Sequence, residues 1–384
     1  MTWKVPLADL DYGPEEERAV IDVLRSKWLT MGAVTQSFEA AFAALTGVKH
    51  AIAVSNATQA LHLACLALEI GPGDEVIVPS LSFVATANAV LYCGADVRFA
   101  EVHSSSEKSR PHDLTIDPAS VAACITPRTK AIIPMHYAGY PCRMMEIMAL
   151  AEDHGLAVIE DAAHAPGGTL DGRALGTFGQ IGCFSFFSNK NLPTGEGGML
   201  VTNRDDLAAR LRLLRSHGMT TLTYERHKGH AFSYDVVALG YNDRIDEIRS
   251  ALGLAQLDKL ADNNAKRLAW THAYWDALAE LPVDLPFKAS DQGTGAYHIF
   301  PMLLPEGTDR AAFMTGLRDA GVQSSIHYRP IHTFSYYVER YGVQSLPITE
   351  ALAQREVTLP LYPTMQEAEF DIVVEAVRRL VAES

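Results

Sequence analysis

Residues 51–79 read AIAVSNATQALHLACLALEIGPGDEVIVP, which is a short apolar run, a polar turn, a longer apolar stretch and a second short apolar run. The runs at 51–55 and 75–79 have the length and β-branched content of buried strands, and the apolar residues between them recur at helical spacing. A strand, a helix and a second strand in this order are typical of a parallel sheet. The same alternation continues to about residue 203, so we predict an α/β fold with a large, mainly parallel sheet between helices. We expect further strands at 95–100, 130–135, 156–160, 182–187 and 198–202, and helices at 57–70, 82–92, 117–123 and 141–154.

The rest of the 384-residue chain predicts a second, smaller unit. Residues 245–281 contain a single glycine and no proline, and their apolar spacing indicates one long helix or a kinked pair. Beyond it, the pattern favours a compact α+β domain. We therefore divide the chain into a large domain, 1–245, and a linking helix with a small C-terminal domain, 246–384. Within the latter we expect strands at 296–304 and 322–328 and helices at 308–320 and 366–382.

Composition excludes several classes of function. A net charge of −14 and a sequence pI near 5.4 disfavour a nucleic-acid or anionic-membrane surface, which needs a basic patch. No apolar run approaches the roughly 18 residues of a membrane span, and the N-terminal residues MTWKVPLADLDYG contain no basic region followed by an apolar run, so we expect a cytoplasmic protein. The five cysteines form no CxxC pair, and we expect neither a metal site nor a disulfide.

Two polar side chains follow strands at the edge where ligands of open α/β sheets bind. The run LAVIEDAAHA (156–165) ends a strand in Asp161, and GCFSFFSNKNLPTGEGGMLVT (182–202) places Lys190 in a turn between two strands. Taken alone, Asp161 is also compatible with a helix N-cap and Lys190 with a solvated loop lysine. Together they suit pyridoxal 5'-phosphate: a lysine forms a Schiff base with its aldehyde, and an aspartate keeps its pyridine nitrogen protonated.

The phosphate of this cofactor needs an anion site, and the turn at 55–58 leads into a helix whose N–H groups and dipole favour one. The alternative is plain capping by Ser55 or Asn56. Phe83 follows the next strand, where its ring is placed either to stack on the pyridine or to fill the core.

Several segments resemble the DegT/DnrJ/EryC1/StrS family of sugar aminotransferases, in the family's order and over residues 28–363. The resemblance implies a fold-type-I, aspartate-aminotransferase-like architecture. The segments are SNATQALHLA, VPSLSFVATANA, EDAAHA, FSFFSNKNLPTGEGG, LGYNDRIDEIRSALGLAQL, IHYRPIH and TLPLYP.

The resemblance also implies roles for individual residues. Lys190 matches the Schiff-base lysine, Asp161 the partner of the pyridine nitrogen, and His164 a residue close to the cofactor hydroxyl. Asn242 matches an asparagine that reaches the phosphate from a partner subunit, which implies a homodimer with shared active sites. Phe83 matches the aromatic residue that stacks on the cofactor ring. Ala57, Thr58 and Ser185 match the residues that bind the cofactor phosphate.

This sequence departs from the family pattern at two positions. Ala57 replaces a glycine of the phosphate turn, a change that an ordinary φ would tolerate. Asp243 stands where an aromatic residue is common, which leaves substrate contacts near it open.

Substrate contacts are expected from side chains outside this cofactor set. Arg226 and His227 lie in a polar stretch, 216–241, that either crosses toward the partner's active site or forms a surface loop. Trp28, His327 and Tyr328 either line the substrate site or have structural roles in the interior.

The implied reaction moves an amino group from L-glutamate to a keto sugar, with pyridoxamine 5'-phosphate as the intermediate form of the cofactor. We expect a nucleotide-linked 4-keto-6-deoxy sugar as acceptor, carried by dTDP, UDP or GDP. The alternatives are a 3-keto nucleotide sugar or a cyclitol such as scyllo-inosose. A sugar dehydratase is disfavoured because that branch of the family has histidine in place of Lys190, and a non-catalytic regulator because Lys190 and Asp161 are both present.

Overall fold

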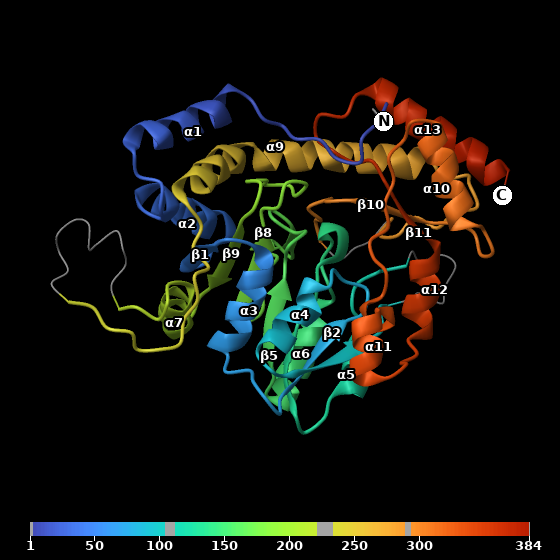
Figure 1. Cartoon of the computed structure of the whole chain (residues 1–384). Helices are drawn as coiled ribbons and strands as arrows, with labels where there is room; N and C mark the ends of the chain where they lie inside the picture. The colour runs from blue at the N-terminus through green and yellow to red at the C-terminus, as the bar shows by residue number, and fades with distance from the viewer. Residues whose placement is uncertain (1–2, 104–111, 221–232, 289–292, 384) are drawn as a thin grey trace.

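The computed structural model describes residues 3–103, 112–220, 233–288 and 293–383. Seven strands form one sheet in the order β1-β9-β8-β5-β4-β2-β3 (Figure 1). Strand β9 runs antiparallel to both neighbours and the remaining pairs are parallel, which confirms the predicted sheet. Its members correspond to the seven runs expected before residue 203. They are β1 (His50–Val54), β2 (Glu75–Pro79), β3 (Asp96–Ala100), β4 (Thr129–Ile132), β5 (Ala157–Asp161), β8 (Ile181–Ser185) and β9 (Gly198–Thr202).

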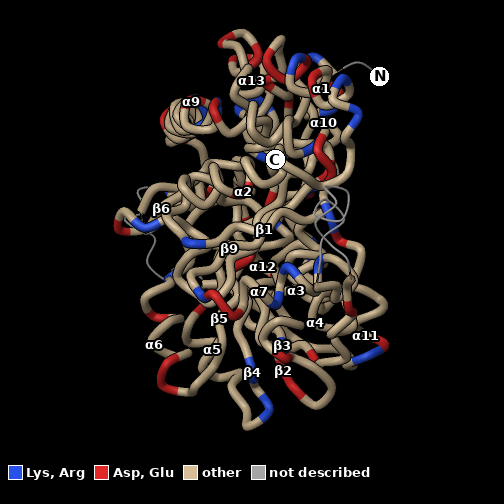
Figure 2. The backbone as a smooth tube through the Cα atoms, turned by 90° about the vertical axis from the view of Figure 1, so that its left-hand side faces the viewer, with Lys and Arg blue, Asp and Glu red and all other residues tan. Residues whose placement is uncertain are grey.

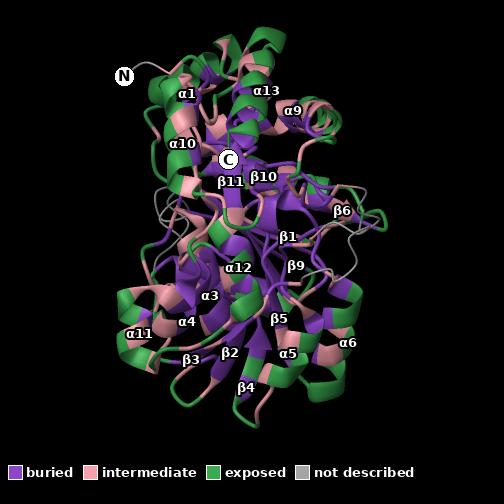
Figure 3. Cartoon of the chain, turned by 90° about the vertical axis from the view of Figure 1, so that its right-hand side faces the viewer, coloured by how far each residue is buried: buried purple, intermediate pink, exposed green. Residues whose placement is uncertain are grey.

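Alternating residues of each strand pack against helices on opposite faces of the sheet. In β1, Ile52 and Val54 contact one helical layer, while Ala51 and Ala53 contact the other. Figure 3 shows the result as a buried sheet between helices whose outer surfaces are exposed. One layer contains α3 (Ala57–Ala67), α4 (Ala85–Tyr92) and α7 (Asp205–Arg215), and the other α2 (Ala33–Thr46), α5 (Pro118–Cys124) and α6 (Met144–His154).

Helix α9 (Glu247–Ala277) confirms the long helix expected at 245–281 and runs across the end of the sheet (Figure 1). At its start the buried Glu247 carboxylate accepts hydrogen bonds from the Gly32 and Thr35 N–H groups, which joins α2 to α9. Near its end, Tyr274 lies in the core of the C-terminal elements. Helix α1 (Pro14–Ser26) packs along the first part of α9.

The C-terminal elements build a separate apolar core around a two-stranded sheet. The predicted strand at 322–328 is wrong as a regular strand, because Val322 pairs with Val5 while Ser325 pairs with Thr358, each in an isolated bridge. The N-terminal segment thus lies against this unit, and the boundary near residue 245 remains our proposal. The elements here are β10 (Phe300–Leu303), β11 (Glu356–Leu359), α10 (Arg310–Asp319), α12 (Pro347–Arg355) and α13 (Glu367–Ala382), with α11 (Ser335–Tyr341) against the layer of α3 and α4.

Charged residues of both signs are interspersed along the described part of the backbone (Figure 2). Among the described residues, no helix has the length and apolar character needed to cross a lipid bilayer. The described residues also include one short strand pair, β6 (Thr169–Leu170) with β7 (Arg173–Ala174), and two 3-10 turns, at Tyr137–Gly139 and Ile331–Thr333.

Candidate active site

The carboxyl ends of the sheet strands border a cavity of about 660 Å³. This is the edge at which parallel sheets bind ligands, as the sequence predicted. The C-terminal part of the chain closes one side with residues 327–328. Of the predicted site residues, the cavity brings together Ala57, Thr58, Phe83, Asp161, His164, Ser185, Lys190, His327 and Tyr328.

Asp161 is the last residue of β5 and is 4% exposed. Its Oδ2 accepts a hydrogen bond from Thr86 Oγ1 at 2.7 Å, and its Oδ1 accepts one from the Ala163 N–H at 3.2 Å. Burial raises the pKa of Asp161, while these two donors and the charge on Lys190 oppose the rise. The carboxylate is therefore held by neutral donors and lies ready for a cationic partner in the cavity.

Lys190 lies in the turn after β8, with its N–H donating to the Phe187 carbonyl. Its Nζ points into the cavity region and lies 3.2 Å from His298 Nε2. Burial lowers the pKa of Lys190 to about 7, and Asp161 only partly opposes that effect. A large fraction of the amine is consequently neutral near pH 7, which is the form that acts as a nucleophile or a base.

His164 is 2% exposed, and its Nε2 lies 2.9 Å from the Tyr328 hydroxyl. Its Nδ1 is buried without a hydrogen-bond partner among the described residues. Because a buried polar atom normally finds a partner, this nitrogen is suited to contact a polar group bound in the cavity. Burial and the charge on Lys190 hold the pKa of His164 well below its usual range, so the imidazole is neutral.

The turn between β1 and α3 presents the start of a helix to the cavity. Asn56 is the N-cap, and its side chain accepts from the Gln59 N–H at 2.9 Å. Ser55 does not line the cavity, and its hydroxyl is hydrogen-bonded to the Gln59 side chain. Ala57 begins the helix without a positive φ, which explains why alanine is tolerated there. The N–H groups of this first turn favour an anion.

Phe83 and Tyr328 provide aromatic walls. Phe83 is 56% exposed, although most phenylalanines are buried, and its ring centroid lies 6.0 Å from that of Tyr328. The ring thus lines the cavity and is partly uncovered. His327 is fixed beside them, with its N–H donating to Glu356 Oε2 and its Nδ1 2.8 Å from Thr358 Oγ1. Burial lowers the pKa of His327 to about 4.

Four predicted residues lie elsewhere in the structure or outside the described part of the chain. Trp28 is partly buried beside Gly32 at the start of α2 and does not line the cavity. Asn242 is exposed and forms an isolated bridge with Ser216. Arg226 and His227 lie outside the described residues. Asp243, at the unusual position, has a buried carboxylate behind the phosphate turn, where its carbonyl accepts from the Ser55 N–H.

Two residues at this site were not predicted from the sequence. Thr86 donates a hydrogen bond to Asp161. The sequence feature that could have identified it is its position in the segment VPSLSFVATANA, which resembles the family and follows β2. His298 contacts Lys190. The sequence AYHIFPMLL predicted only a strand, and a single histidine in a strand is usually a core residue, so the contact was not expected.

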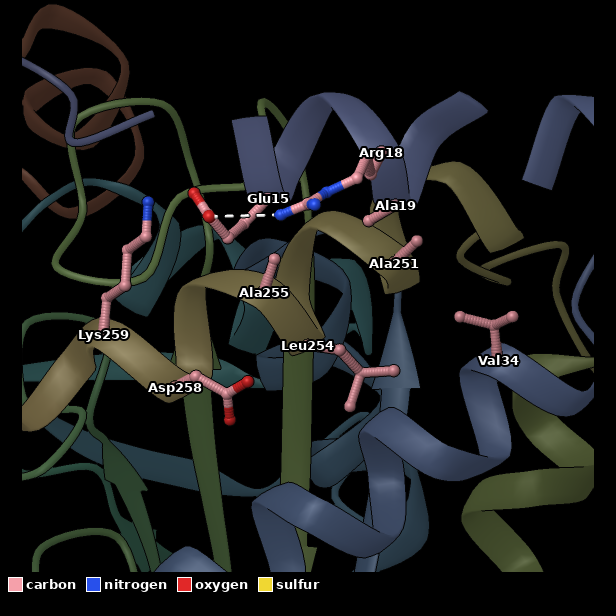
Figure 4. A pocket seen from close by; sticks show the side chains of 9 residues that line it. All are labelled: Glu15, Arg18, Ala19, Val34, Ala251, Leu254, Ala255, Asp258 and Lys259. Carbon is pink, nitrogen blue, oxygen red and sulfur yellow. Dashed lines mark hydrogen bonds and ion pairs between the residues drawn. The ribbon is translucent and has the colours of Figure 1, made fainter. Parts of the chain in front are cut away.

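A second cavity, of about 470 Å³, lies where α1 crosses α9 (Figure 4). Of its four charged lining residues, Arg18 and Glu15 contact each other at 3.2 Å and Lys259 contacts Glu16 at 2.9 Å, while the fourth is Asp258. Its other lining residues are mostly alanine, valine and leucine. This cavity offers no convergent reactive groups, so the chemistry belongs to the cavity at the sheet edge.

Comparisons with known proteins agree with this geometry. The sequence profile of the DegT/DnrJ/EryC1/StrS aminotransferase family matches residues 11–378. The spore coat polysaccharide biosynthesis protein SpsC of Bacillus subtilis (strain 168) is 39% identical over 376 residues, 96% of this chain and 95% of SpsC.

Two solved structures cover nearly the whole chain. PseC of Helicobacter pylori, an aminotransferase involved in the biosynthesis of pseudoaminic acid, has a TM-score of 0.91 at 29% identity and covers 99% of this chain and 100% of its own. Spr1654 of Streptococcus pneumoniae in its PLP form has a TM-score of 0.90 at 26% identity and covers 99% of both chains.

Proposed function

Because the chain belongs to the DegT/DnrJ/EryC1/StrS aminotransferase family, we propose that it transfers the amino group of L-glutamate to a nucleotide-linked keto sugar. The chain is a pyridoxal-phosphate-dependent sugar aminotransferase of the fold-type-I class. The proposal concerns the donor, the acceptor and the roles of the individual residues.

The residues around the cavity fit the cofactor. Asp161 would hold the ring nitrogen through its buried carboxylate, and His164 has a buried Nδ1 without a partner among the described residues. The start of α3, with Thr58, and Ser185 would bind the phosphate, and Phe83 would cover the ring. When bound, pyridoxal 5'-phosphate supplies the electron sink that stabilises negative charge at the substrate carbon.

The single observation that carries the proposal is the convergence of Lys190 and Asp161 on one cavity from neighbouring strands. Lys190 has a pKa of about 7, so its Nζ is able both to take the proton from the α-carbon of the donor and to return it. Asp161 stays acceptor-only while ionised and keeps its cationic partner protonated. Substituting Lys190→Ala should abolish turnover and the visible absorbance of the loaded enzyme, and a variant that still transfers amine would refute the role.

A second subunit would supply the cations that acidic substrates need. Among the described lining residues, Lys190 is the single lysine or arginine, whereas glutamate and a sugar diphosphate both carry negative charge. Large aromatic side chains at the cavity are exposed in the single chain, with Phe83 56% and Tyr92 59% exposed. We therefore propose a cytoplasmic homodimer in which Asn242 and the stretch 216–241, with Arg226 and His227, reach the partner's site.

Mixing two inactive variants tests the shared site. A Lys190→Ala chain paired with an Asn242→Ala chain has one intact site per heterodimer, so random exchange should restore about one quarter of wild-type activity. Restoration requires that Asn242 works in trans, whereas no recovery after verified subunit exchange would contradict a shared site. Substituting Arg226→Ala should raise KM for the nucleotide sugar and leave KM for glutamate unchanged.

We propose a 4-keto-6-deoxy sugar as the acceptor, from the resemblance of the 216–241 stretch to relatives that act at C4. A 3-keto nucleotide sugar and a cyclitol ketone are the alternatives, and a role in amino-sugar biosynthesis is in line with the pathway of PseC. Incubation with glutamate and a panel of 3-keto, 4-keto and cyclitol ketones, followed by NMR location of the new amine, separates them. Absence of amine transfer to every ketone would favour dehydration instead.

A further inference from the structure

The imidazole of His298 lies beside Lys190 and has no part in the function proposed above. Its Nε2 is 3.2 Å from Lys190 Nζ, and the side chain is buried. His298 precedes β10, so it approaches the amine from the C-terminal part of the chain rather than from the sheet. An imidazole nitrogen at this distance either donates to the amine or accepts from it, and the two cases have opposite consequences.

Asn191 decides between them. Its Nδ2 donates to the Ala296 carbonyl at 2.6 Å and to Asn264 Oδ1 at 2.8 Å. A backbone carbonyl only accepts, so the orientation of the Asn191 amide is fixed and its Oδ1 faces His298 Nδ1 at 3.0 Å. The single N–H of a neutral imidazole must then be on Nδ1. Nε2 therefore presents a lone pair to Lys190.

The surroundings keep the His298 imidazole neutral. Burial, followed by the charges on Lys190 and His164, holds the pKa of His298 well below its usual range. The Arg267 guanidinium donates to the His298 carbonyl at 3.1 Å and adds a positive charge nearby. A second proton on Nε2 is thus disfavoured, and the ring acts toward Lys190 as an acceptor only.

We propose that His298 is a positioning residue for Lys190: its Nε2 accepts a hydrogen bond from the lysine amine and directs the lone pair of Nζ toward the reacting carbon. This inference rests on the proposed role of Lys190 as proton carrier. When Lys190 is neutral, one of its two N–H bonds points to His298 and the lone pair is free. After Lys190 takes a proton, one of its three N–H bonds points to His298, and the proton stays on Nζ. The titratable groups that interact with the amine or line the same cavity are Asp161, His164, His298, His327, Tyr328, Glu196 and Tyr92.

The first readout is the reactivity of Lys190 in the full chain without added cofactor. The rate of acylation of Lys190 is followed against pH by mass spectrometry of its peptide. In His298→Phe the ammonium form of Lys190 loses a hydrogen-bond acceptor. The inflection in the curve of acylation rate against pH should therefore move to a lower pH by about one unit. In His298→Gln, whose Oε1 is able to accept in place of Nε2, the inflection should return toward that of the wild type.

The second readout is the half-reaction of the loaded enzyme with L-glutamate. In His298→Phe, kcat should fall by about 10²-fold because Nζ is no longer aimed. The deuterium isotope effect on the α-proton should increase, while KM for glutamate changes less than about twofold. A merely structural defect would lower activity in proportion to the folded fraction and leave the isotope effect unchanged.

The matched control is His332→Phe. His332 is similarly buried and hydrogen-bonded, with Nδ1 2.6 Å from Ser80 Oγ and Nε2 3.1 Å from Glu350 Oε1, so its ring nitrogens contact these two side chains and not Lys190. The His332→Phe variant should be less stable, but the inflection in the acylation of Lys190 and the isotope effect should both stay at their wild-type values. If His298→Phe does not fold, Asn191→Leu serves instead, because freeing the Nδ1 proton should lower the inflection in the same direction.

A wild-type inflection in His298→Phe or Asn191→Leu, or a His298→Gln variant that behaves like His298→Phe, would overturn the inference. Failure of the proposed role of Lys190 is separable, because it shows as amine transfer by Lys190→Ala and leaves the acylation readout untouched.

Discussion

Replacing Thr86 by valine should shift the profile of kcat against pH along the pH axis without changing the shape of the profile. Thr86 Oγ1 lies 2.7 Å from Asp161 Oδ2 and 2.6 Å from Ser82 Oγ, and all three side chains are buried. An ionised carboxylate only accepts, so Thr86 must donate to Asp161 and accept from Ser82. Valine has nearly the same volume, removes that donor and also removes the acceptor of the Ser82 hydroxyl.

The size of the shift follows from the charge on Asp161. A hydrogen bond to a charged group contributes about 1.5–3 kcal/mol, and 1.36 kcal/mol corresponds to one pKa unit, so the pKa of Asp161 should rise by about 1–2 units. The ionised form, which holds the ring nitrogen, is then lost at a higher pH as the solution is acidified. The acid limb of kcat against pH should move upward by about 1–2 pH units.

Thr35→Val is a closely matched control. Thr35 Oγ1 donates to the buried Glu247 carboxylate at 2.6 Å and lies 2.8 Å from Ser250 Oγ, but none of these three residues lines the cavity. Both variants should lose about 1–3 kcal/mol of unfolding free energy in urea titrations. Only Thr86→Val should move the acid limb, and an acid limb at the wild-type position in both would refute the reasoning.

Three further substitutions test the cofactor site. Phe83→Ala should weaken pyridoxal-phosphate binding about 2–10-fold through loss of ring stacking, and unchanged affinity in a fluorescence titration would contradict that contact. Asn56→Ala should cost about 1 kcal/mol of stability and also weaken binding of the cofactor phosphate, whereas Asp309→Ala, which uncaps α10, should cost stability only. Gly198→Ala should disrupt cofactor binding, because a Cβ there would lie 2.5 Å from the backbone of Asn56. Gly71→Ala, whose nearest atom would be 3.9 Å away, should bind normally.

The sheet was predictable because its signals are local. Each strand is a short apolar run bounded by turn residues, and the position of Asp161 and Lys190 after strands followed from the geometry of parallel sheets. Helix α1 was not predicted, although Pro14 at its first position and Glu16, whose carboxylate accepts from the Gly13 N–H, are start signals that the sequence contains.

The parts that sequence could not supply depend on contacts between distant segments. His298 is 108 residues from Lys190, and Thr86 is 75 residues from Asp161, so neither partner is visible in the local pattern. The error at 322–328 has a related cause. That segment has strand-like composition, but its residues pair with two different partners, Val5 and Thr358, and so form no continuous ladder.

The pairing of the N-terminal segment with residues near 321 has a consequence for biosynthesis. The Lys4 and Val5 N–H groups donate to the Gly321 carbonyl, and the Leu7 N–H donates to Gln323, 316 residues later in the chain. The Gln323 acceptor is synthesised 316 residues after its Leu7 donor, so the segment around residues 4–7 waits unpaired while the sheet assembles. An affinity tag fused directly before residue 3 would stand next to this late closure.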